Sequence, residues 1–362
     1  YYLRYGVDLK EREEFTFSPV NFGVVLHAVI REVCDEIKKN GESYYLISEE
    51  KRREMVKRSV AAITDIYQNS ILKDSSRNSF MIKRMEDLAD RTVWAMGEQL
   101  KCGDFVPFVF EHKFNMEVGD GDRKQLMSGT IDRVDICENG TDVYVRIIDY
   151  KTGKKDFNIV KTYYGIDIQL MVYMEAAMKL VAKMRPGKNV IPAGVFYYNI
   201  SDPIVSATTE SAEEIEDKIK GELRLKGMVN SDKDIAEKMD NTEGTSLNIP
   251  VSRKADGGFD SRRSKVMNTE QFNILGRFVD VRAIDTADRI AGGDIRRSPY
   301  KDGQFSSCDR CPYGAVCGFS VDLPGCNYRK LKKFDDEVLW NNIKEGVDEN
   351  GKKMDTGAEE RD

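Results

Sequence analysis

The hydrophobic pattern of the first hundred residues predicts three helices. Apolar residues recur at helical spacing over 22–33, and the Asn-Gly pair at 40–41 predicts the end of that helix. Two further helices are predicted near 48–67 and 79–100. This part of the chain should therefore form a helical layer.

The pattern then changes to short segments rich in Val, Ile and Phe, which are typical of strands. Three such segments are predicted, at 105–118, 125–137 and 142–150. Asn139-Gly140 favours a hairpin between the last two, because both central positions of that turn need positive φ. A helix around 167–183 and a strand at 190–200 follow.

This order of elements predicts an α/β core, a small mixed sheet flanked by helices. The region after the core is polar and charge-rich, and the C-terminal stretch alternates acidic and basic residues. The predicted division is a core at 1–200, an insertion or peripheral layer at 201–265, a segment at 266–305 whose long helix (about 269–291) closes the core, a cysteine-rich segment at 306–334 and a mobile acidic tail at 335–362.

The composition, 40% hydrophobic and 33% charged residues, fits a globular protein, with no run of about 20 apolar residues for a membrane span. The net charge of −6 argues only weakly against a nucleic-acid partner, because DNA responds to local potential. Basic clusters at 51–58, 262–265, 296–297 and 329–333 fit either DNA contacts or solvated helix faces. Scattered single cysteines without an export signal favour a reducing, intracellular setting.

Two acids and a lysine fall on adjacent predicted strands. Side chains alternate along a strand, so Asp149 and Lys151 share a face while Tyr150 points away. The hairpin can bring Asp132 beside Asp149, and paired carboxylates suit Mg²⁺ or Mn²⁺, which supports phosphodiester hydrolysis. Lys151 could orient a water or offset negative charge. An isolated Asp-x-Lys triplet is more often a surface ion pair. The presence of Asp132 on the hairpin partner makes a catalytic role more favourable here than for such an isolated triplet.

Several motifs occur in a fixed order: His27 in FGVVLHAVI, then GTIDRVD, IDYKTG and QLMVY. Together they resemble the RecB-type branch of the PD-(D/E)XK nuclease superfamily. The resemblance implies a restriction-endonuclease-like fold and metal-dependent DNA cleavage. The roles it implies are metal ligands at His27, Asp132, Asp149 and the Tyr150 carbonyl, a catalytic lysine at Lys151, and supporting residues at Gln169, Tyr173 and Glu111.

Four cysteines crowd one segment, as Cys308-x2-Cys311-x5-Cys317 followed by Cys326. Thiolates at this spacing can converge on zinc or on an iron–sulfur cluster. A disulfide framework and a chance crowding of structural thiols are the alternatives.

A nuclease core followed by these cysteines resembles the AddB family of bacterial helicase–nuclease subunits. The segments YYLRYG at 1–6 and GDIRRSPY at 293–300 also resemble it. The resemblance implies DNA as substrate, an AddA-like partner subunit, a bacterial cytoplasmic setting, and a [4Fe-4S] cluster held by Cys308, Cys311, Cys317 and an upstream cysteine. That cysteine would precede Tyr1, so we expect an incomplete or absent cluster here, with Cys326 as the alternative ligand.

The leading hypothesis is hydrolysis of one DNA strand, by the resemblance the 5′-terminated one, in double-strand-break repair and recombination. The sequence lacks G-x-x-x-x-G-K-[ST], so it predicts no ATPase motif. The alternatives are a stand-alone RecB-type exonuclease with an iron–sulfur cluster, and a non-catalytic scaffold that binds DNA ends. The complete set of His27, Asp132, Asp149 and Lys151 favours an enzyme.

Overall fold

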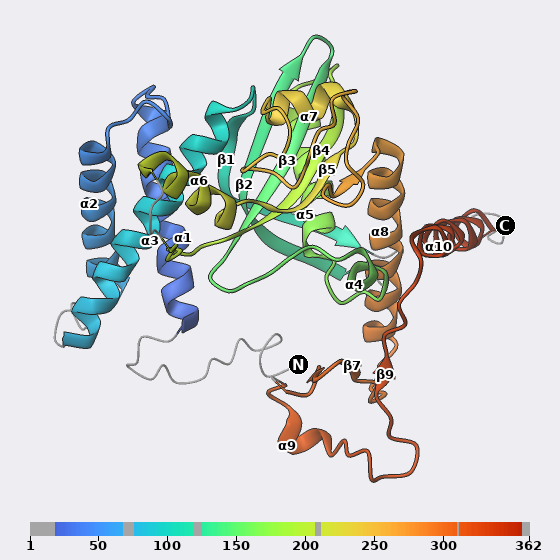
Figure 1. Cartoon of the computed structure of the whole chain (residues 1–362). Helices are drawn as coiled ribbons and strands as arrows, with labels where there is room; N and C mark the ends of the chain where they lie inside the picture. Colours follow the sequence, from blue (N-terminus) through green and yellow to red (C-terminus); the bar gives the residue numbers. More distant parts are fainter. Residues whose placement is uncertain (1–18, 68–75, 119–124, 207–210, 310, 357–362) are drawn as a thin grey trace.

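A six-stranded mixed sheet stands between two groups of helices in the computed structural model, which describes residues 19–67, 76–118, 125–206, 211–309 and 311–356 (Figure 1). One face is covered by α1 (Pro19–Lys39), α2 (Glu49–Tyr67) and α3 (Ser76–Lys101), and the other by α5 (Gln169–Met184) and α8 (Thr269–Ala291). The predicted α/β class with a small mixed sheet flanked by helices is confirmed.

The strands follow the order of the chain across the sheet: β1 (Val106–Val118), β2 (Gln125–Asn139), β3 (Asp142–Lys151), β4 (Asn189–Asn199), β5 (Lys226–Asn230) and β6 (Val266–Met267). The strand pairs β1–β2, β2–β3 and β4–β5 are antiparallel, whereas β3–β4 and β5–β6 are parallel. Parallel neighbours need a long crossover, which α4 (Ile159–Tyr163) and α5 supply between β3 and β4.

Strand β3 is buried on both faces, as is usual for a strand with helices above and below it. Val143, Val145 and Ile147 contact the cluster around α5 and α8, whereas Tyr144 and Ile148 contact the cluster around α1 and α3. Since β3 and β4 are parallel, their carboxyl ends meet at one edge of the sheet. Ligands of open α/β sheets bind outside such an edge.

The segment expected as an insertion or peripheral layer at 201–265 contributes to the sheet itself. It contains α6 (Ala212–Glu222) and α7 (Lys233–Met239), and β5 lies between them and pairs with β4. Gly227 lies against the Val195 carbonyl so closely that any Cβ would clash with it. A five-residue strand within a charged segment has too short an apolar pattern to be read from sequence.

The C-terminal region also differs from the expected mobile tail. α10 (Asp336–Thr356) packs on α8 and buries Leu339 and Ile343, which lie four residues apart on one helix face. The cysteine-rich segment forms a small three-stranded sheet, which Figure 1 shows beyond the lower end of α8. Its elements are β7 (Tyr300–Asp302), β8 (Phe305–Ser306), α9 (Gly314–Cys317) and β9 (Arg329–Lys330). In the part of the chain that is described, no helix has the length and apolarity to cross a membrane.

A buried ion cluster joins β2 to β3. Asp135 accepts hydrogen bonds from Arg133 at 2.6 and 2.7 Å and from Arg146 at 2.8 Å, and all three side chains are almost completely buried. Burial alone would raise the pKa of Asp135, but the two guanidinium groups outweigh it and hold that pKa below its usual value. The cluster therefore depends on Asp135 to compensate two buried cations.

We expect Asp135→Ala to lower the free energy of unfolding by about 3–5 kcal/mol, because it leaves two arginines buried without a counter-ion. Urea unfolding at neutral pH measures the change. The matched control is Glu138→Ala on the same strand, where a more exposed ion pair with Arg185 is removed and a change below about 1 kcal/mol is expected. Equal losses in the two variants would contradict this role for the cluster.

Candidate metal and catalytic site

The long β1–β2 ribbon changes which face it presents at Glu111 and Asp132. Along β2, Val134 and Ile136 contact the cluster around α5. Ile131 contacts the same cluster, although in a regular strand an odd-numbered residue would face the other side of the sheet. Glu111 has a φ of 47°, and within the described chain it is the one residue other than glycine with a positive φ. The pairs on either side, Phe110 with Arg133 and His112 with Ile131, place Glu111 opposite Asp132. Such irregularities re-aim side chains next to active sites. Here the change of face brings both carboxylates toward α1.

His27 of α1 meets these two carboxylates. Its Nδ1 lies 3.4 Å from Asp132 Oδ1 and 3.7 Å from Glu111 Oε1. The ligand atoms of all three residues lie within 4.8 Å of one another. The Tyr150 ring packs against His27 on the face of β3 that α1 covers, with ring centroids 5.8 Å apart in a T-shaped arrangement.

Asp132 is also tied to the end of β3. Its Oδ2 accepts a 2.6 Å hydrogen bond from the Tyr150 backbone amide. The register of β2 against β3, which runs from Arg133 opposite Ile148, places Asp132 next to Asp149. Both carboxylates are buried, so three acidic groups, with Glu111, occupy one small volume at the edge of the sheet.

Lys151 and two residues of α5 surround Asp149. Lys151 Nζ lies 2.5 Å from Asp149 Oδ2 and donates a 3.2 Å hydrogen bond to Gln169 Oε1. The amide of Gln169 donates to Asp149 Oδ1 at 3.1 Å and contacts Tyr173 Oη at 2.9 Å. Gln169 therefore fixes the relative positions of the carboxylate and the ammonium.

The crowding of acids shifts two protonation equilibria. Burial disfavours the charged imidazolium, but hydrogen bonds and charges from Asp132 and Glu111 outweigh it and raise the pKa of His27 to about 10. Burial, followed by the charge of Asp132, raises the pKa of Asp149 to about 6 despite the nearby Lys151 ammonium. A proton on His27 up to about pH 10, and on Asp149 below about pH 6, therefore reduces the negative charge of the site.

A second network, absent from the sequence predictions, lies directly beside Lys151. Tyr197, opposite Asp149 in the β3–β4 register, donates a 2.7 Å hydrogen bond to Asp167 Oδ1, and Lys155 Nζ lies 3.1 Å from the same oxygen. The Tyr197 ring lies 5.6 Å from Lys151 Nζ and 4.6 Å from Lys155 Nζ. The only sequence signal for it is Lys155, the last lysine of K-T-G-K-K, so only the fold identifies these residues.

The structure thus brings together the residues singled out in the sequence at this edge. Tyr150 contributes its backbone amide to Asp132 and its ring to His27. The convergent side chains are His27, Glu111, Asp132, Asp149, Lys151, Gln169 and Tyr173. The resemblance implied only a supporting role for Glu111, but its carboxylate lies beside His27 as a possible metal ligand, because the positive φ turns it toward α1.

The donor set fits a hard divalent cation. Carboxylate oxygens with one imidazole nitrogen are ligands that Mg²⁺ or Mn²⁺ accepts, and the surplus of acidic groups is what such an ion would neutralise. Among the described residues, the three that the metal-ligand geometry selects are His27, Glu111 and Asp132. Asp149 stands next to them, linked through Asp132.

The cysteines are arranged differently. Cys326 is buried, Cys311 is exposed, and Cys308 and Cys317 are intermediate, and all are free thiols. No three of these described sulfur atoms lie within 4.8 Å of one another, whereas a tetrahedral zinc ion would need about 3.8 Å between thiolates. As placed, these thiols do not form a zinc site.

In the metal-free protein we expect His27 to stabilise the fold in a pH-dependent way. Its folded-state pKa of about 10 lies above the ordinary value of 6.5, so its contribution is fully present below pH 6.5 and is lost as the pH rises through about 10. The difference in unfolding free energy between the wild type and His27→Gln should shrink over that interval, measured by urea unfolding in EDTA. His112→Gln is the control, and a pH-independent difference for His27→Gln would refute the assignment.

Comparisons with known proteins agree with this geometry. Proteins named as a subunit of an ATP-dependent helicase/deoxyribonuclease match over nearly the whole chain: 33% identity over 366 residues in Thermoanaerobacter sp. (strain X514), 34% over 373 in Caldanaerobacter subterraneus subsp. tengcongensis and 34% over 371 in Lachnoclostridium phytofermentans. These alignments cover 98%, 100% and 99% of this chain but 32% of each relative, so the chain spans about a third of their length.

The profile of the PD-(D/E)XK nuclease superfamily matches residues 1–318, which include every residue of the convergent cluster and the first three crowded cysteines. The six-stranded mixed sheet and the acid–acid–lysine arrangement at its edge are consistent with that match. The chain therefore belongs to the PD-(D/E)XK nuclease superfamily.

Proposed function

We propose that this chain hydrolyses DNA phosphodiester bonds at the edge of the sheet where β3 ends. The observation that carries the proposal is the convergence of His27, Glu111 and Asp132 within 4.8 Å, next to the Asp149–Lys151 pair. A divalent cation bound there would neutralise charge on the phosphate and lower the pKa of the attacking water. We propose His27, Asp132 and Asp149, with the Tyr150 carbonyl, as its ligands, and add Glu111.

The roles of the remaining residues follow from their contacts. Lys151 carries a positive charge next to Asp149, where it can hold the water and offset charge that develops on the phosphate. Gln169 bonds both groups, so it fixes how Lys151 and Asp149 lie relative to each other. Tyr173 holds Gln169 in turn, so α5 positions the lysine relative to the acids.

We infer a wider context from the relatives. Their shared name describes part of an ATP-dependent helicase/deoxyribonuclease, which supports a role for this chain as the nuclease domain of an AddB-like protein. Such a protein would act on DNA ends with an AddA-like partner in the bacterial cytoplasm during double-strand-break repair, on the 5′-terminated strand. The match across nearly the full chain favours this context over a stand-alone exonuclease.

We expect Asp149→Asn and Lys151→Met to lower the Mg²⁺-dependent cleavage of single-stranded DNA about a hundred-fold or more, because each removes a charge at the reacting phosphate. Since burial and Asp132 raise the pKa of Asp149 to about 6, the asparagine variant should be at least as stable as the wild type at pH 8 in EDTA. Cleavage of a labelled oligonucleotide and urea unfolding are the two measurements.

Two controls match these variants. Asp142→Asn changes an acid at the opposite end of β3, and Lys188→Met changes a lysine in the loop before β4. Both should cleave at the wild-type rate. Wild-type cleavage by Asp149→Asn or Lys151→Met would remove the proposed centre, and equal loss in the controls would show a general effect on folding.

We also propose that Cys308, Cys311 and Cys317 hold an iron–sulfur cluster, with the fourth ligand from Cys326 or from a cysteine outside this sequence. Anaerobic purification followed by iron and sulfide analysis decides between the two. We expect stoichiometric iron only in a longer protein, and Cys326→Ser should then leave it unchanged. Full iron in this chain that disappears in Cys326→Ser would assign the fourth ligand to Cys326.

A further inference from the structure

A large groove opens beyond the carboxyl ends of β3 and β4. It encloses about 1320 Å³, more than the roughly 300–1,000 Å³ of a small-molecule pocket. It is lined by the first half of helix α3, the loop after Lys151, the segment after β4 and the segments that flank β5. The lining, called the basic groove below, comes from residues within 80–88, 152–156, 199–204, 222–226 and 263–265, with Phe22 and Pro250.

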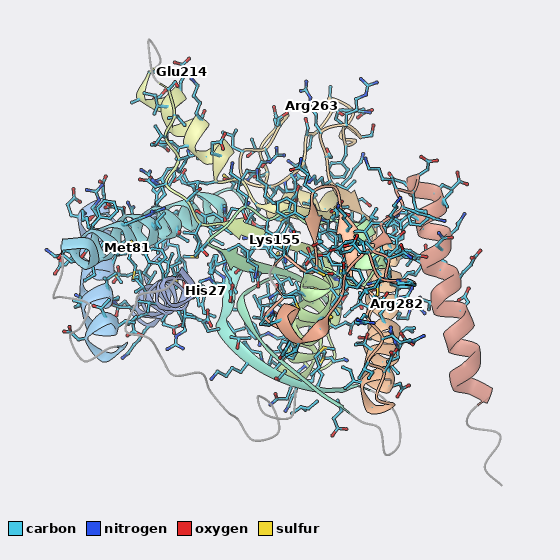
Figure 2. All side chains as sticks on the ribbon, turned by 90° about the horizontal axis from the view of Figure 1, so that it is seen from below. His27, Met81, Lys155, Glu214, Arg263 and Arg282 are labelled. Atoms are coloured by element: carbon cyan, nitrogen blue, oxygen red, sulfur yellow. The ribbon has the colours of Figure 1, made fainter. Side chains whose placement is uncertain are left out.

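The groove adjoins the catalytic cluster through two elements. Thr152, in its lining, follows Lys151 directly in the chain, and Phe22 lies five residues before His27 on α1, about 7.5 Å along the helix. Figure 2 shows Lys155 toward the centre of this face, with His27 between it and Met81 of α3. A polymer lying in the groove would therefore reach the acids at the end of β3.

The charge of the groove is opposite to that of the whole chain. Eight basic side chains line it against four acidic ones, although the chain carries a net charge of −6. Three of these acids already have partners: Asp87 with Lys83 at 3.0 Å, Asp156 with Lys265 at 2.5 Å and Asp202 with Arg91 at 3.3 Å. Five lining cations have no carboxylate within 4.0 Å among the described residues, namely Arg84, Lys154, Arg224, Lys226 and Arg263, although Arg224 donates hydrogen bonds to backbone carbonyls. Unpaired cations along a groove suit a polyanion.

Apolar side chains also lie exposed in this lining. The Phe80 side chain is 65% exposed and Ile204 is fully exposed, although both belong to a surface rich in charge. An aromatic ring beside a row of cations is the combination that binds single-stranded nucleic acid, because unpaired bases stack on the ring while the backbone follows the charges. In a duplex the base faces are stacked inside and cannot reach Phe80.

We propose that the basic groove binds single-stranded DNA on one side of the cleaved phosphate, with Lys226 and Arg263 contacting the backbone and Phe80 stacking on a base. This inference rests on the proposed nuclease function, from which it takes DNA as the polymer. It adds the groove outside the metal centre in which the strand lies and the residues that hold it there.

Binding without metal tests the groove separately from cleavage. The probe is a fluorescently labelled oligo-dT, titrated with the full chain in EDTA at several salt concentrations and followed by anisotropy. Replacing both Lys226 and Arg263 by Ala should weaken binding and reduce the slope of log affinity against log salt by about 1.4, or about 0.7 for each lost phosphate contact. Phe80→Ala should weaken binding about ten-fold without changing that slope.

Two controls and one further probe separate the outcomes. Lys57→Ala on α2 and Phe305→Ala on β8 alter exposed residues outside the groove and should bind as the wild type does. On an abasic oligomer, Phe80→Ala should have no effect, because no base is present to stack.

The proposal is overturned if the double variant keeps the wild-type affinity and salt slope, or if Phe80→Ala weakens the abasic and oligo-dT probes equally. Tighter binding of a duplex than of oligo-dT by the wild type would also overturn it. If the groove variants behave as expected but the wild type never cleaves DNA with Mg²⁺, the proposed hydrolysis fails while the groove stands.

Discussion

Three carboxylates held in one small volume at the end of β3 are the constraint on which the candidate site depends. Glu111, Asp132 and Asp149 come from three adjacent strands, and among the described residues His27 and Lys151 are the basic side chains that lie against them. Without a metal ion, the acids raise the pKa of His27 to about 10 against the effect of its burial, and burial together with Asp132 raises the pKa of Asp149 to about 6. A divalent cation would replace those protons, so metal affinity should be coupled to pH.

The sheet makes this crowding tolerable because its strands cannot move apart independently. β3 is buried on both faces, and the Arg133–Asp135–Arg146 cluster joins it to β2 on the face opposite Asp149. The repulsion between the acids therefore acts against a packed core and a buried ion network. Energy that the site loses to charge crowding is offset by burial elsewhere in the same two strands.

Charge is separated over the surface near the site. The acids gather where β3 ends, and the unpaired cations of the basic groove lie beyond them along a path that begins at Thr152. A cation and a polyanion would thus meet at the boundary between the two regions. The net charge of the whole chain, −6, describes neither region. It is therefore only weak evidence against a nucleic-acid partner.

Local patterns in the sequence determined most of the fold. The long helix was predicted at 269–291 and lies at those residues, and the hairpin at Asn139-Gly140 set the pairing of β2 with β3. Helical periodicity and turn chemistry act over a few residues, so one sequence suffices to read them. The short strand β5 and the packed helix α10 departed from expectation because long-range pairing and burial decided them.

The candidate site divides in the same way. Alternation along β3 placed Asp149 and Lys151 on one face from sequence alone, because strand geometry has a period of two. The positive φ of Glu111, the contact of His27 with two acids and the Tyr197–Asp167 network come from elements far apart in the chain. Only tertiary structure decided these, since the packing of helices on a sheet, and not neighbouring residues, sets the distances across them.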